Sequence, residues 1–124
     1  MSGAVTRRVK FVALAVAGAA LIGCAAPVKP IYHWEGYQRQ LYGHLKGEGT
    51  NPDEQMRLLQ AHAEKARAAG LALPPGFRAH MGLVSLRLGR DAEAKQQLEA
   101  EKSVFPESAP YMDFLLKRMS QPKP

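Results

Sequence analysis

The stretch FRAHMGLVSLRLGRDAEAKQQLEAEKSVFP, residues 77–106, decides the fold. Apolar side chains recur every three or four residues in its first half and predict a helix over 77–88. Gly89 is expected to end this helix, and a second helix is expected over 92–104, before Pro106. The side chains expected to face inward are Phe77, Met81, Val84 and Leu88 in the first helix and Ala94, Leu98 and Val104 in the second.

The pattern of small residues in this stretch resembles one tetratricopeptide (TPR) repeat, a 34-residue unit of two helices. The matching residues are Gly82, Leu86, Gly89, Ala94, Leu98 and Pro106. Where the repeat has two aromatic residues and a late alanine, this chain has Arg78, Ser85 and Glu101. The resemblance covers 75–108 and implies that the two helices cross closely where Gly82 and Ala94 lie.

Further helices are predicted on both sides of this unit, because a single repeat cannot bury its own apolar faces. Asn51 is a good N-cap residue followed by proline, and it predicts a helix that runs to about Ala69. Ser108 is expected to cap a last helix that reaches Met119. One more helical stripe precedes these helices and comprises Trp34, Tyr37, Leu41 and Leu45.

No segment combines apolar alternation with β-branched residues, so the fold class is predicted to be all-α. We expect short antiparallel helices that form a TPR-like array of about one and a half to two repeat units. This domain is expected to span residues 31–120, and residues 121–124 are expected to be a disordered tail.

Residues 1–23 have the features of a signal peptide. Arg7, Arg8 and Lys10 precede an apolar run over 11–23. That run is shorter than the roughly 20 residues that a membrane-spanning helix needs, and it fits the core of a signal peptide, which has about 7–15. We therefore expect this segment to be cleaved, and residues 24–30, with two prolines, to form an extended tether.

The sequence Leu21-Ile22-Gly23-Cys24 resembles the lipobox of bacterial lipoproteins. The resemblance implies cleavage before Cys24 and acylation of its thiol and new amino group, which would anchor the chain in a membrane. Ala25 follows where an Asp would favour the inner membrane. The resemblance thus implies an outer-membrane anchor with the helical domain facing the periplasm.

A wider resemblance covers nearly all of the chain after the tether. Residues 74–82 and 101–108, with Tyr32, Trp34, Tyr37, Leu41 and Tyr42, resemble a family of small proteobacterial outer-membrane lipoproteins with a TPR-like domain of unknown function. Members are commonly encoded beside a CsgG-like lipoprotein. The resemblance implies an accessory of an envelope assembly or secretion complex, with a CsgG-like partner.

Charge and cysteine content exclude several other classes of protein. Three of the 17 Lys and Arg residues lie in the signal-peptide segment and none of the 11 acidic residues does, so its removal halves the net charge of +6. The remaining charge argues against nucleic-acid binding. A lone Cys excludes an intramolecular disulfide and a zinc site built on several thiolates.

Four histidines are candidate metal ligands: His33, His44, His62 and His80. None lies three or four residues from another, so no helix presents two on one face, and no metal site or other cofactor is predicted. No nucleophile motif surrounds the serines, and no phosphate loop is present. The chain is therefore expected not to be an enzyme.

Two groups of residues are candidates for partner contact. Arg78, Arg87 and Arg90 are expected to lie loosely on one side of the helix over 77–88, where they would either form a solvated face or bind an acidic peptide. Aromatic residues between Tyr32 and Tyr42 would fill the array, lie at the lipid headgroups or dock a partner.

The function predicted from the sequence is that of an outer-membrane lipoprotein acting as a non-enzymatic protein–protein interaction module. The alternative is a structural envelope protein that contacts peptidoglycan or forms a homo-oligomer. The sequence does not distinguish a monomer from a homo-oligomer.

Replacing Cys24 by Ser tests the anchor. Cells grown with labelled palmitate are expected to label the wild-type chain and not Cys24→Ser, because the thioether cannot form. Equal labelling of both chains would contradict lipidation at this residue.

Overall fold

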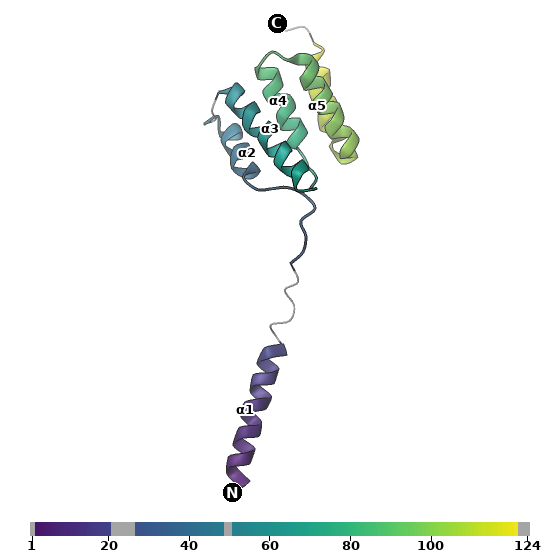
Figure 1. The fold of residues 1–124 in the computed structure, drawn as a ribbon. Coiled ribbons are helices and arrows are strands. Elements are labelled where there is room, and N and C mark those ends of the chain that lie inside the picture. Colours follow the sequence, from purple (N-terminus) through teal and green to yellow (C-terminus); the bar gives the residue numbers. More distant parts are fainter. Residues whose placement is uncertain (1, 21–26, 49–50, 122–124) are drawn as a thin grey trace.

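The computed structural model describes residues 2–20, 27–48 and 51–121, and these form helices with no β-strand (Figure 1). The all-α prediction is confirmed. The elements are α1 (Ser2–Ala20), α2 (Tyr37–Lys46), α3 (Pro52–Ala68), α4 (Phe77–Arg87), α5 (Asp91–Val104), the short 3₁₀ helix η1 (Pro106–Ser108) and α6 (Ala109–Met119).

The most extensive contact between helices is the crossing of α4 and α5. A Cβ atom added to Gly82 would lie 3.2 Å from the carbonyl oxygen of Ala94 and 3.2 Å from the side chain of Leu98. Ala94 and Leu98 are fully buried. Glycine at position 82 lets the two backbones approach this closely without displacing Ala94 or Leu98, so the crossing expected from the repeat pattern is confirmed.

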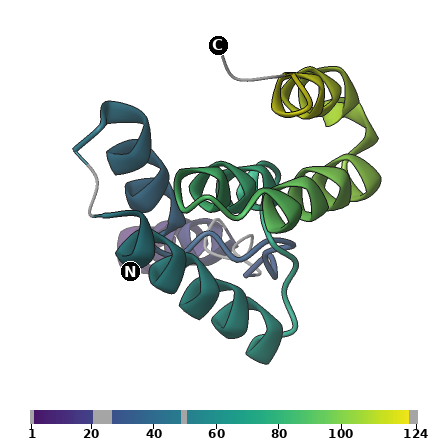
Figure 2. The same cartoon turned by 90° about the horizontal axis from the view of Figure 1, so that it is seen from above.

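Helix α4 lies in the middle of the array, between α3 and α5 (Figures 1 and 2). On one side it packs with α2 and α3 around a core of Tyr37, Met56, Leu59, Phe77, Met81 and Val84. On the other side it packs with α5 and α6 through Ala79, Leu98 and Met112. These two clusters make α2 to α6 a continuous helical array of the TPR-like kind.

The segment before α2 is fixed to the array by backbone hydrogen bonds. The amide of His33 donates to the carbonyl of Ala72 over 2.9 Å, and the amide of Ala72 donates to the carbonyl of Ile31 over 3.2 Å. The ring of Tyr32 lies 6.1 Å from that of Phe105. Residues 31–36 therefore run along the array as part of the domain.

Most of the predicted helix ends are confirmed. The side chain of Asn51 accepts a hydrogen bond from the amide of Glu54 over 2.8 Å and caps α3. Gly70 and Gly89 have φ angles of +64° and +70°, and they follow the ends of α3 and α4. Because L-residues rarely adopt this conformation, glycine ends both helices at these places.

Three details of the prediction are wrong. Trp34 precedes α2 and is 42% exposed, because the helix begins only at Tyr37. Val104 is 51% exposed, and Phe105 is buried in its place because the chain leaves the helical path there. The hydroxyl of Ser108 donates to the carbonyl of Phe105 over 2.7 Å and makes no cap hydrogen bond to α6.

The N-terminal helix α1 lies apart from the other helices (Figure 1). Within the described residues, no helix has both the length and the apolar character needed to cross a membrane. The lipobox, including Cys24, and the tail beyond Gln121 lie outside the described residues.

The close crossing predicts that a larger residue at position 82 destabilises the fold. Gly82→Val is expected to lower the free energy of unfolding by about 1–3 kcal/mol, because its side chain must displace α5. A Cβ atom added to Gly43 in α2 would meet no neighbouring element within 4 Å. Gly43→Val is therefore the matched control, with an expected change of about 0.5 kcal/mol or less. Urea denaturation of both variants measures the difference, and equal stability would contradict the crossing.

Candidate functional site: an apolar groove between alternate helices

An apolar groove with a volume of about 390 Å³ lies between α2, α4 and the start of α6. We call it the concave groove. Its walls include Leu41 and Leu45 from α2, Ala79, His80 and Leu83 from α4, and Tyr111 and Met112 from α6. Leu45 and Tyr111 are 74% and 57% exposed. Large apolar side chains therefore remain in contact with water along the face that these alternate helices share.

The buried carboxylate of Glu101 holds one end of the groove together. Its two oxygens accept hydrogen bonds from the backbone amides of Gly76, over 2.6 Å, and Arg78, over 3.2 Å. These amides are at the start of α4, where no residue of the adjacent loop supplies a side-chain cap. A carboxylate is also stabilised by the positive end of the helix dipole. Glu101 in α5 thus caps α4.

Tyr37 lies at the floor of the groove and is almost fully buried. Its ring packs 4.8 Å from that of Phe77 and 5.9 Å from that of His80, measured between centroids. Burial, and to a lesser extent the charge of Glu101, raise the pKa of Tyr37 well above its ordinary value. The phenol therefore stays protonated, and among the described residues its hydroxyl has no hydrogen-bond partner.

His80 is the second polar group at the floor, and it is 4% exposed. Its ring lies 4.4 Å from that of His44, and neither of its nitrogens has a hydrogen-bond partner among the described residues. Burial, with a smaller contribution from His44, lowers the pKa of His80 to about 4. At neutral pH the ring is uncharged, so one nitrogen donates and the other accepts.

The four histidines form two pairs in space, which the sequence spacing does not show. His33 packs on His62 with ring centroids 4.6 Å apart, and His44 packs on His80. Nε2 of His62 also lies 2.8 Å from the carbonyl oxygen of His33. Across the described residues, His, Cys, Asp and Glu side chains form no group of three or more that could hold a metal ion.

The three candidate arginines do not share one face of α4. Arg78 is half-buried in the first turn of α4, Arg87 is the exposed last residue, and Arg90 precedes α5, 3.7 Å from Glu93. Nine residues, the interval from Arg78 to Arg87, are about 2.5 helical turns and lead to opposite sides. The prediction that the three arginines share one side of the helix is therefore wrong. None of the three lines the concave groove.

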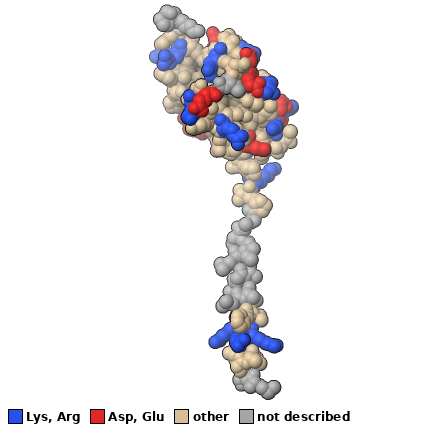
Figure 3. All heavy atoms as spheres, turned by 90° about the vertical axis from the view of Figure 1, so that its left-hand side faces the viewer, with Lys and Arg blue, Asp and Glu red and all other residues tan. Residues whose placement is uncertain are grey.

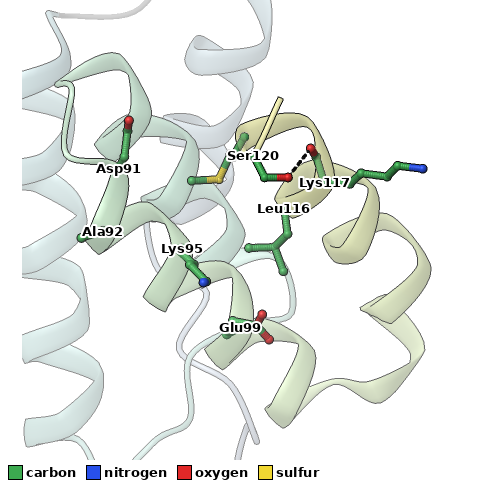
Figure 4. Close-up of a pocket in the computed structure, with 8 residues that line it drawn as sticks. Asp91, Ala92, Lys95, Glu99, Leu116, Lys117 and Ser120 are labelled. Atoms are coloured by element: carbon green, nitrogen blue, oxygen red, sulfur yellow. Dashed lines mark hydrogen bonds between the residues drawn. The ribbon is translucent and has the colours of Figure 1, made fainter. Parts of the chain in front are cut away.

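A second hollow lies between α5 and α6, at the far end of the array (Figure 4). Its lining includes Asp91, Lys95, Glu99 and Lys117, and Ser120 donates to the carbonyl of Lys117 over 2.8 Å. Acidic and basic side chains are also interspersed over the face of the helical body in Figure 3. The lining of this hollow carries charges of both signs, as does that face of the helical body. The concave groove differs, because it contains buried polar groups without hydrogen-bond partners among the described residues, and we therefore take it as the candidate binding site.

Sequence reasoning missed both Glu101 and the groove floor. A signal for Glu101 was present, because it departs from the small residue of the repeat pattern and α4 begins after Pro-Pro-Gly, with no capping side chain. The pairing of Tyr37 with His80 had no such signal, since the two residues lie on different helices.

The fold and the groove together define an all-α, TPR-like helical array with an apolar groove between alternate helices. The chain belongs to the family described as a domain of unknown function (DUF4810), whose model matches residues 31–115. The matched range runs from the segment before α2 into α6. Comparison with curated proteins and with solved structures finds no match.

Substitution of Glu101 tests its role as a cap. Glu101→Ala leaves buried amide donors without an acceptor and is expected to lower the free energy of unfolding by about 1–3 kcal/mol, with faster hydrogen exchange at Gly76 and Arg78. Glu101→Gln retains one acceptor oxygen and should cost less. Glu99→Gln, on the exposed side of α5, is the control. Glu101→Ala with wild-type stability and exchange would contradict the capping role.

The lowered pKa of His80 predicts that the folded state loses stability in acid. Between pH 6.5 and 4 the unfolded chain binds a proton at this ring and the folded chain does not, so stability falls as pH falls through that window, by up to about 3 kcal/mol. His80→Phe keeps a ring but cannot titrate, so its denaturation midpoint should depend less on pH. An unchanged pH dependence would contradict the assignment.

Proposed function

We propose that this protein is a lipid-anchored, non-enzymatic interaction module of the bacterial outer membrane, and that its concave groove binds a segment of another envelope protein. The observation that carries the proposal is the groove itself. Its walls expose Leu45 and Tyr111, while α2 and α6 are held to the array through buried Tyr37 and Met112. Exposed apolar surface of this kind, gathered in a concave site, is typical of binding sites.

The ionisable groups at the groove floor favour binding over catalysis. Tyr37 is held protonated by burial, and the oxygens of Glu101 are engaged by backbone amides. His80 is held neutral, and no carboxylate of the described residues hydrogen-bonds to its ring. A general base or nucleophile needs a partner that activates it, and these side chains instead form a fixed, uncharged floor beside one capped carboxylate.

The proposed location rests on the N-terminal sequence. The cations of residues 7–10, the apolar run that follows and Cys24 at its end support export and lipidation. Residues 24–30 would then hold the array close to the periplasmic face of the membrane. The resemblance to lipoproteins encoded beside a CsgG-like lipoprotein supports a role as an accessory of envelope assembly or secretion, with a CsgG-like partner.

Site-specific photo-crosslinking tests the groove as the interaction surface. A photoreactive amino acid at position 45 or 111 of the full-length chain is expected to crosslink one defined protein in living cells. The same amino acid at exposed Gln60 on α3, outside the groove, is the control. Crosslinking of the same protein from position 60 alone, or of no protein from positions 45 and 111, would contradict the proposal.

A further inference from the structure

The charges of the concave groove have one sign. Its described lining includes the carboxylates of Glu101 and Glu107 and no Lys or Arg. Glu101 is buried at the floor, whereas Glu107 in η1 and Tyr111 in α6 are both exposed and both line the groove. The groove is therefore electronegative, although the chain as a whole is basic.

An anionic partner is disfavoured at this site. The start of α4 would attract an anion through its free amides and the helix dipole, but the carboxylate of Glu101 already occupies those amides. The other groups at the floor, the protonated Tyr37 and the neutral His80, carry no positive charge.

A cationic side chain finds complementary groups at the rim of the groove. The carboxylate of Glu101 is 1% exposed and bonded to backbone amides, so it acts on a bound cation through its charge and not by direct contact. At the rim, Glu107 offers an ion pair, and the face of Tyr111 offers a cation–π contact.

We infer that the occupant of the concave groove is a protein segment that combines apolar side chains with a lysine or arginine. The apolar side chains pack against Leu41, Leu45 and Leu83, while the cation lies near Glu107 and Tyr111. A volume of about 390 Å³ is near the lower end of the range for ligand sites, about 300–1,000 Å³, so a few side chains fill it. The inference rests on the proposed function and specifies the chemistry of the partner.

Selection from a library of random heptapeptides displayed on phage tests this chemistry. The full-length chain in detergent micelles is the bait, and Leu45→Ser is panned in parallel, because it removes apolar surface from the groove without disturbing a buried residue. The expected peptides are enriched in Lys or Arg next to Leu, Ile or Phe. Their binding should weaken about tenfold on Leu45→Ser.

A double-mutant cycle with one selected peptide then locates the cation. Glu107→Gln is expected to weaken binding about two- to fivefold. Replacement of the basic residue of the peptide by Gln should have the same effect. The loss of binding free energy for the two changes together should be smaller than the sum of the two separate losses. Glu64→Gln, exposed on α3 and outside the groove, is the matched control and should leave the Kd unchanged.

Two further results would overturn the inference in different ways. Peptides that depend on Leu45 but carry Asp or Glu, or no preferred charge, would refute the cationic partner and leave the groove as an interaction site. If no selected peptide distinguishes the wild-type chain from Leu45→Ser, both the inference and the proposed function fail.

Discussion

The close crossing of α4 and α5 is the constraint on which the rest of the structure depends. Gly82 allows the backbone of α4 to approach Ala94 and Leu98, and this approach brings Glu101, one turn further along α5, to the start of α4. The same helix pair then supplies packing surfaces to both sides of the array. The groove has a defined shape because its central wall, α4, is held at two places. One is its crossing with α5, and the other is its first turn, where Glu101 binds the backbone amides.

The carboxylate of Glu101 links the stability of the fold to the character of the groove. A buried negative charge is costly unless it is satisfied, and here two backbone amides satisfy it. The groove floor therefore contains a stable carboxylate beside a neutral imidazole and a protonated phenol. This combination gives the groove a charge opposite to that of the chain as a whole and limits what can bind there.

Much of the fold could be predicted from the sequence because local rules decide it. Asn51 caps a helix through its own side chain, and Gly89 ends one through its backbone conformation, so both act over a few residues. The crossing at Gly82 was predictable through the spacing of the repeat pattern. Helical periodicity alone was less reliable at the ends, where Trp34 and Val104 lie outside the buried faces.

The site was harder to predict, because its residues meet across helices. Glu101 acts on Gly76 and Arg78, more than 20 residues earlier, and His80 meets His44 and Tyr37 only after α2 has docked on α4. The candidate arginines are separated by an interval that places two of them on opposite sides of a helix.

Hydrogen exchange of the full-length chain, followed by mass spectrometry, tests the central role of the α4–α5 pair most directly. Exchange should be slowest in peptides from α4 and α5, because their amides open only with the whole array, and faster in the outer helices α2 and α6. Exchange in α4 as fast as in α2 and α6 would contradict the account.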